Sequence, residues 1–173
     1  TATSKIKWTG SKVVGSTHFG TIDIKSGYVN FDGGKPQNGE VVVDMNTIKN
    51  EDVKDSKWNT KLVGHLKSDD FFGVKKYPLS KFKLTKIMPV KDDLYKVYGT
   101  LVIKNKEKEF NFNANVVSKT AKKLSAKGTL VFDRTHFDVR YGSGKFFDKL
   151  GDKMISDEIK LEISLDVVDG KAS

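Results

Sequence analysis

The chain has 173 residues, a net charge of +9 and no cysteine. The absence of cysteine excludes a disulfide framework, a thiol nucleophile and a thiolate metal site, and the length suits one domain over residues 1–173. The basic side chains are 29 Lys and two Arg, spread along the whole sequence. This distribution is typical of a solubilising surface rather than of the clustered arginines that read nucleic acid, so we expect no nucleic-acid partner.

The first part of the chain alternates apolar and polar residues, as strands do. Ile6 and Trp8 alternate with lysines in a short first strand, and residues 12–32 follow as extended chain. The apolar face of this second segment changes parity along its length, which predicts a bulge or bend near residues 26–27. Asn38-Gly39 is a strong turn signal, and we expect a turn there before the next strand.

Between residues 52 and 72 the apolar residues recur at every fourth position instead of every second. Trp58, Leu62 and Leu66 are four residues apart, which places them on one face of a short helix. The residues that follow present Phe71 and Phe72 from a turn. The sequence therefore predicts one short amphipathic helical insertion around residues 52–72, in a chain that is otherwise made of strands.

Two of the later strands are long and have one apolar and one polar face. Residues 157–168 carry an apolar side chain at every second position, and residues 108–117 repeat the pattern. About twelve residues at about 3.3 Å each make a strand of about 40 Å. An open sheet of such strands would leave a large apolar face in water, so it must pair with a second sheet or close on itself.

We predict an all-β fold, an extended eight-stranded antiparallel up-and-down barrel. About eight strands follow one another through short connections, with the helical insertion after the fourth strand. A barrel of this size can fill its own interior or hold one small ligand. Small residues on otherwise apolar faces favour a cavity: Gly99, Ala114, Ala126 and Gly128.

The alternation also predicts which side chains would line such a cavity. The predicted lining residues are Val41, Val43, Phe82, Leu84, Leu101, Ile103, Phe110, Phe112, Leu130, Phe132, Ile159, Leu161, Ile163 and Leu165. We expect the helical insertion to cover one end of the barrel and to contact the ligand through Trp58, Leu62, Leu66, Phe71 or Phe72.

The residues of catalytic chemistry do not form a recognisable set. The three histidines, His18, His65 and His136, lack a metal-ligand spacing, and the sequence has no Gly-x-Ser-x-Gly turn and no phosphate-binding glycine loop. We therefore predict no catalytic residues, no metal site and no cofactor. An enzyme that acts on a lipid-like substrate, with His18 or His136 as base, is the alternative from another class.

The two arginines lie within a stretch of seven residues, in an irregular segment that also holds Tyr141. A guanidinium offers a planar fork of donors that lysine lacks, so Arg134 and Arg140 indicate fixed geometry. One interpretation is structural, with an arginine that pins the loop through a carboxylate or a carbonyl. The other is that an arginine, together with His18 or Tyr141, contacts the polar head of a bound molecule.

Three blocks of sequence resemble the YceI-like family: His18-Phe-Gly20, the run KLVGHLKSDDFFGVKKYP over residues 61–78, and the run FDRTHFDVRYGSG over residues 132–144. Their order and spacing cover most of the chain. One departure is the hairpin over residues 103–109, where this chain reads IKNKEKE and the family often reads IKGVTKP.

The resemblance implies a lipocalin-type barrel, exported to the bacterial periplasm after removal of a signal peptide, that binds a polyisoprenoid or an isoprenoid quinone-like chain. We therefore expect a non-enzymatic protein for transport, storage or sensing of a long isoprenoid or fatty amphiphile. A structural or stress protein with a filled barrel is a further alternative. Weak association with an anionic membrane surface and a homodimer are left open.

Overall fold

The computed structural model describes residues 4–32, 35–119, 123–168 and 171–172. Within these ranges the chain forms one antiparallel sheet whose strands neighbour each other in sequence order. The elements are β1 (Lys5–Lys12), β2 (Thr17–Asp32), β3 (Lys35–Asn50), α1 (Ser56–Lys67), β4 (Leu79–Lys91), β5 (Leu94–Ile103), β6 (Lys106–Lys119), β7 (Lys123–Asp133), the 3-10 helices η1 (Arg134–Phe137) and η2 (Gly151–Lys153), β8 (Ile155–Val168) and β9 (Lys171–Ala172).

The sheet closes into a barrel because β1 pairs with strands on both sides. Ile6 lies opposite Ile22 of β2 and opposite Ile163 of β8. The predicted eight-stranded up-and-down barrel is confirmed, with β9 as a two-residue addition that pairs with β8 and with Gly27 of β2. Closure leaves β1 and β8 with no free edge along their ladders.

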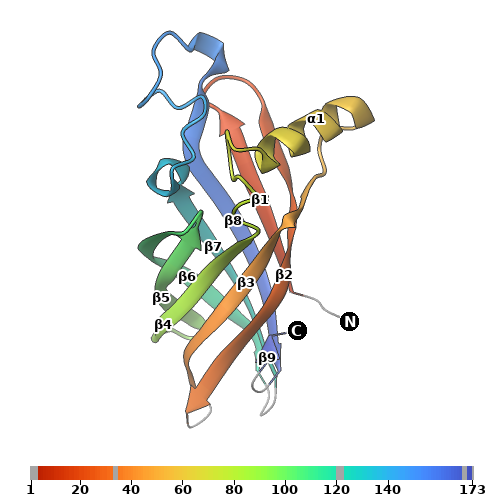
Figure 1. Ribbon diagram of the computed structural model, residues 1–173. Helices are drawn as coiled ribbons and strands as arrows, with labels where there is room; N and C mark the ends of the chain where they lie inside the picture. Colours follow the sequence, from red (N-terminus) through yellow and green to blue (C-terminus); the bar gives the residue numbers. More distant parts are fainter. Residues whose placement is uncertain (1–3, 33–34, 120–122, 169–170, 173) are drawn as a thin grey trace.

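The two ends of the barrel are built differently (Figure 1). One end, called here the helical end, carries α1, the β1–β2 connection and the irregular segment between β7 and β8. The opposite end, called here the hairpin end, carries the β2–β3 and β4–β5 connections. Chain that is not strand therefore gathers at the helical end, where it covers the barrel.

The second strand is a single bent strand of 16 residues. Its ladder with β3 shifts register between Ile24 and Ser26, which confirms the predicted bulge. Because β2 is one strand, α1 follows the third strand and not the fourth. The expected turn at Asn38-Gly39 is wrong as well, since both residues lie inside β3 and pair with β2.

The helical insertion is confirmed as α1 and the turns that follow it. The Asp55 side chain caps the helix by accepting a hydrogen bond of 2.9 Å from the Trp58 backbone N–H. The helix ends at Lys67, and the backbone N–H of the C-cap residue Ser68 donates to the His65 carbonyl at 3.1 Å. No helix among the described residues is long and apolar enough to cross a membrane.

Two clusters of buried apolar side chains fill the interior near the helical end. One cluster comprises Ile6, Ile22, Met45, Ile48 and Val74, and the other comprises Leu101, Ile103, Leu130, Phe132 and Phe137. Val74 and Phe137 come from the segments that cover this end, so the cover and the barrel share one core. All members of the two clusters except Val74 and Phe137 also line a cavity inside the barrel.

Candidate functional site

An elongated cavity of about 230 Å³ lies inside the barrel. Its wall includes β3 from Pro36 to Ile48 and β8 from Ile159 to Val167. The β8 part alone spans eight residue steps, or roughly 26 Å of strand at about 3.3 Å per residue. Small-molecule sites usually measure about 300–1,000 Å³, so a cavity of this volume and length is narrow and suits a slender chain.

The predicted cavity wall agrees closely with the structure. Thirteen of the fourteen predicted positions line the cavity: Val41, Val43, Phe82, Leu84, Leu101, Ile103, Phe112, Leu130, Phe132, Ile159, Leu161, Ile163 and Leu165. Their alternation in sequence put them on one face of each strand, and the closed barrel turns that face inward. Whether they bind a ligand stays a prediction.

Phe110 is the exception, and the cause is a gap in the barrel wall. β6 and β7 pair only from Ala114 to Lys119 with residues 124–128, so Phe110 lies beyond the ladder. There its ring packs against Phe132 at 6.4 Å and stacks on Phe137 of η1 at 6.2 Å. Phe110 therefore seals the wall between two separated strands and does not line the cavity.

Other lining residues were not among the predicted positions. They come mainly from the first three strands, namely Ile6, Trp8, Ile22, Val29, Met45 and Ile48, with Ile87, Val97, Ala114 and Ala126 from later strands. Alternation was visible at Ile6 and Trp8, and Ala114 and Ala126 were noted for their small size. The register shifts of β2 exchange its inward and outward positions, so simple parity does not identify Val29.

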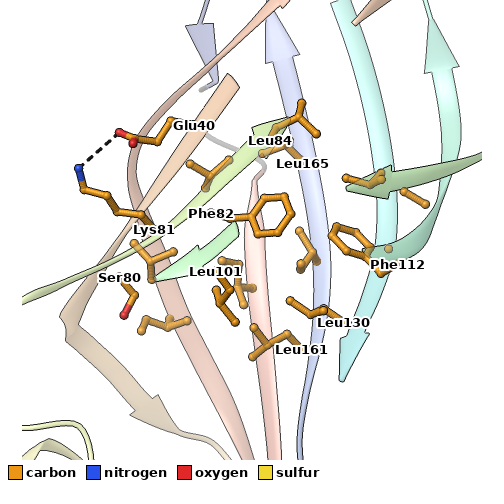
Figure 2. Close-up of a pocket in the computed structure, with 18 of the residues that line it drawn as sticks. Glu40, Ser80, Lys81, Phe82, Leu84, Leu101, Phe112, Leu130, Leu161 and Leu165 are labelled. Atoms are coloured by element: carbon orange, nitrogen blue, oxygen red, sulfur yellow. Dashed lines mark ion pairs between the residues drawn. The ribbon is translucent and has the colours of Figure 1, made fainter. Parts of the chain in front are cut away.

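The interior of the cavity is apolar, as Figure 2 shows for Phe82, Leu84, Leu101 and Leu130. Ser80 is buried and directs its hydroxyl to the Met45 sulfur at 3.1 Å.

Two charged residues of the wall, Glu40 and Lys81, form an ion pair of 3.6 Å. In Figure 2 their side chains point toward each other and away from Phe82 and Leu84. A third, Lys127, is exposed on the outward parity of β7. A charged ligand group inside the cavity would thus lose its hydration without gaining a partner, which is costly.

The insertion covers the cavity with only part of its predicted face. Leu66 and Phe72 line the cavity, whereas Phe71 is buried beside it and Leu62 is half-buried outside it. The predicted contact of Trp58 with a ligand stays a prediction, but its side chain is 60% exposed and does not line the cavity. The reason is the direction of α1, whose C-terminal turn lies over the barrel while its N-terminal turn projects away (Figure 1).

Arg134 is fully buried and holds the irregular segment against β8. Its Nε donates to the Ser156 carbonyl at 2.9 Å and its Nη1 to the Val139 carbonyl at 2.9 Å. Its Nη2 reaches the Ile155 carbonyl at 3.2 Å and Asp157 Oδ1 at 3.4 Å. Burial lowers the pKa of Arg134, and the charge of Asp157 opposes this shift. These contacts support the structural interpretation of Arg134.

The other predicted headgroup residues have separate contacts. Arg140 pairs with Asp138 at 2.8 Å and lies over the Phe146 ring at 4.7 Å. Tyr141 is 43% exposed, and its ring packs on His65 at 4.6 Å. Neither residue lines the cavity, nor do His18 and Arg134. The structure therefore places all four at the helical end but does not gather them around the cavity.

His18 belongs to a polar network that joins β2 to the chain before α1. Its Nδ1 lies 2.7 Å from Asp52 Oδ2, and Asp52 Oδ1 accepts the Phe19 backbone N–H at 2.8 Å. Partial burial would raise the pKa of Asp52, but the hydrogen bonds from Phe19 and His18 outweigh it and lower that pKa. No group of three His, Asp or Glu side chains in the described part of the chain is placed to hold a metal ion.

A closed antiparallel barrel of eight strands with an apolar cavity defines the architecture of the lipocalin-like barrels. The model of the YceI-like domain matches residues 1–167, and the chain therefore belongs to the YceI-like family. Comparison with curated protein sequences gives no match.

Solved structures share the fold. The crystal structure of BcnA from Burkholderia cenocepacia is 23% identical, with a TM-score of 0.72 over 96% of this chain and 97% of that one. A polyisoprenoid binding domain from Saccharophagus degradans, implicated in plant cell wall breakdown, is 15% identical, with a TM-score of 0.70 over 98% and 95%. The YceI protein of Campylobacter jejuni is 22% identical, with a TM-score of 0.64 over 85% and 81%. At these identities the likeness concerns the fold.

Proposed function

We propose that the barrel binds one long hydrocarbon chain in its cavity, a polyisoprenoid or a similar amphiphile, and acts as a carrier or sensor of it. The observation that carries the proposal is an elongated cavity with an apolar interior, whose charged wall residues Glu40 and Lys81 point away from it. Membership in the YceI-like family and the likeness to a polyisoprenoid binding domain support the same ligand class.

The energetics favour a chain without charge along its length. Each buried methylene contributes about 0.8 kcal/mol, so about ten methylenes contribute about 8 kcal/mol before the cost of association is subtracted. A charged head finds no partner in the cavity and stays outside it. A neutral head, such as a hydroxyl or a quinone, pays a smaller cost of burial.

The geometry disfavours the alternative of a lipid-processing enzyme. A general base must come within hydrogen-bond reach of the reacting atoms. His18 is held by Asp52 at 2.7 Å, His136 is 55% exposed, and neither lines the cavity. A bound chain would therefore meet no candidate base along its length. The cavity likewise disfavours the filled-barrel alternative.

We also propose that the protein works in an exported compartment such as the periplasm. A hydrocarbon chain crosses an aqueous space slowly because its apolar surface is costly in water, so a soluble carrier between two membranes is useful there. Fractionation of the native host tests this: recovery of the protein from the periplasmic fraction supports it, and recovery from the cytoplasm contradicts it.

Substitution inside the cavity tests the binding proposal. Ala126→Phe adds a ring to the cavity wall on β7, whereas Val131→Phe adds the same ring at an exposed position of the same strand. We expect Ala126→Phe to weaken retention of a radiolabelled polyprenol by about tenfold or more, because the ring occupies the space of the chain. Val131→Phe should bind like the wild type. Equal retention by both folded variants would contradict binding in the cavity.

A further inference from the structure

The helical end exposes four large apolar side chains on two segments. Val13 and Val14, in the β1–β2 connection, are 59% and 62% exposed. Phe146 and Phe147, in the loop between η1 and η2, are 45% and 48% exposed. Apolar side chains gathered in this way mark an interaction surface more often than isolated ones do.

The two segments are linked through the start of β8. The Val13 backbone N–H donates to the Met154 carbonyl at 2.9 Å, and the Ile155 backbone N–H donates to the carbonyl of Gly142, in the loop that carries the phenylalanines, at 2.8 Å. Both segments lie at the same end of the barrel in Figure 1. We call Val13, Val14, Phe146 and Phe147 together the apolar tip.

The phenylalanines of the apolar tip are held outward by a defined turn. The backbone N–H groups of Phe146 and Phe147 both point to the Ser143 carbonyl, each at 3.1 Å, and Ser143 is fully buried. A Cβ on Gly142 would lie 3.0 Å from the Ile155 side chain, so the turn packs closely on the start of β8. The exposure of the two rings is therefore fixed by the loop that carries them.

Cationic side chains surround the apolar tip. Residues 12–16 and 140–154 hold five cationic side chains and two carboxylates, but Arg140 pairs with Asp138, and Lys145 pairs with Asp133 and Asp157. Lys12, Lys149 and Lys153 are exposed and form no ion pair with a described residue. The cations are Lys12, Arg140, Lys145, Lys149 and Lys153, and the carboxylates are Asp148 and Asp152. Trp58, with Lys61 at 4.9 Å from its ring, is exposed at the same end of the barrel. Aromatic and aliphatic side chains among lysines are the composition of surfaces that bind anionic bilayers.

We propose that the helical end docks on an anionic lipid bilayer through the apolar tip. Phe146 and Phe147 enter the boundary between headgroups and acyl chains, and the surrounding lysines contact anionic headgroups. The loop follows directly on η1, whose Phe137 fills the gap between β6 and β7, so docking brings this part of the wall to the bilayer. The docking rests on the proposed function for its purpose, because a carrier of a membrane lipid must meet a membrane.

Vesicle flotation tests the docking with variants at opposite ends of the barrel. The test variant is Phe146→Ser/Phe147→Ser, and a second one is Val13→Ser/Val14→Ser. The matched control is Met88→Ser/Val90→Ser, which removes two side chains that are 40% and 55% exposed near the hairpin end of β4. The probes are phosphatidylcholine vesicles with and without phosphatidylglycerol, and melting temperatures verify that each variant is folded.

We expect the wild type to float with the anionic vesicles, less so at high salt, because salt screens the lysines. The phenylalanine variant should bind about tenfold to hundredfold more weakly, the valine variant should also lose binding, and the control should keep it. Absence of wild-type binding, an unaffected phenylalanine variant, or an equal loss in the control would overturn the proposal. A wild-type dimer that the phenylalanine variant dissociates would assign the tip to a second copy and overturn it too.

Native mass spectrometry of the same samples separates this proposal from the proposed function. Protein that retains an apolar molecule but does not float would leave the carrier function standing and remove the docking. Protein that floats but retains no apolar molecule would support the docking and remove the carrier function.

Discussion

Arg134 shows how a sequence signal can be read in two ways until its surroundings are known. The choice of arginine twice in a lysine-rich chain indicated fixed geometry, and the structure supplies that geometry at one of the two positions. Arg134 is fully buried and donates to three backbone carbonyls and one carboxylate, whereas Arg140 is 56% exposed. Three of the four partners of Arg134, at Ser156, Ile155 and Asp157, are more than twenty residues away in sequence, which residue type alone does not reveal.

Replacement of each arginine by lysine separates the two roles. Arg134→Lys keeps the charge but loses the fork that reaches Ser156, Val139 and Ile155, which should cost about 2–4 kcal/mol. For a protein of this size the melting temperature should fall by roughly 5–15 °C. Arg140→Lys should change stability by less than about 0.5 kcal/mol, because Arg140 is exposed. Thermal unfolding of both variants checks this, and equal melting temperatures would show that Arg134 is not a pin.

Asp133 gives the fold a defined acid sensitivity. Partial burial would raise the pKa of Asp133, but hydrogen bonds from Lys145 and Thr135 outweigh it and lower the pKa to about 2, from 3.8. A carboxylate with a lowered pKa stabilises the fold fully above the pKa of the unfolded chain, here about 4. This stability is lost as the pH falls from about 4 through about 2.

We therefore expect the urea midpoint of the wild type to fall more steeply between pH 4 and pH 2 than that of Asp133→Asn. The difference in unfolding free energy between the two proteins should be about 2 kcal/mol at pH 7 and should shrink toward pH 2. The remaining carboxylates titrate in both proteins, so the comparison isolates Asp133. A constant difference across this range would refute the assigned pKa.

Gly39 shows why the sequence predicted a shorter third strand than the structure contains. Asn38-Gly39 predicted a turn, yet a Cβ on Gly39 would lie 2.2 Å from the Tyr28 carbonyl oxygen. The glycine permits the close approach of β2 and β3 inside the ladder, and no positive φ is required at this position. A glycine that frees the backbone to turn and one that makes room for a neighbour look the same in a sequence.

A pair of alanine substitutions tests this role. Gly39→Ala should destabilise the protein by about 1–3 kcal/mol, because the new Cβ meets backbone that must shift. Gly64→Ala, in α1, meets nothing within 4 Å and should stabilise the helix by up to about 1 kcal/mol. Urea unfolding measures both. Similar effects of the two substitutions would mean that the close contact at Gly39 is easily relieved.

The sequence predicts which alternate residues of a strand face the interior wherever the ladder is regular. β8 pairs with β7 without a register shift from Glu158 to Val168, and its alternate positions 159, 161, 163 and 165 all line the cavity. Parity fails where one residue is inserted, as in β2. It also misses Phe110, because the end of the β6–β7 ladder depends on contacts with η1 that are remote in sequence.

The helix α1 was predictable as an element but not in its direction. Spacing of four residues identifies one apolar face, and that face includes Trp58, Leu62 and Leu66. Only Leu66 reaches the cavity, because Lys67 fastens the C-terminal turn to the Asn46 carbonyl at 2.6 Å while the N-terminal turn projects outward. The periodicity of a helix fixes a face, whereas docking against another element decides how much of that face is buried.

The interior of the barrel is filled by packed side chains in part and contains a cavity in part. Buried clusters pack toward the helical end, and the small residues Ala114 and Ala126 line the cavity on β6 and β7. A barrel meant only for stability would gain from filling this space, since a cavity lacks the dispersion contacts that a packed core has. Stability therefore does not account for the cavity, whereas binding of a ligand does.

Native mass spectrometry of the protein purified from its own host, without detergent or organic solvent, measures that function directly. The account predicts a complex heavier than the polypeptide, whose added mass disappears on denaturation and is recovered in the organic phase as a hydrocarbon-rich molecule. The Ala126→Phe variant, prepared in the same way, should lack most of the added mass. Wild-type protein that has only the mass of the polypeptide, and that takes up no added polyprenol, would contradict the account and leave the barrel without a lipid ligand.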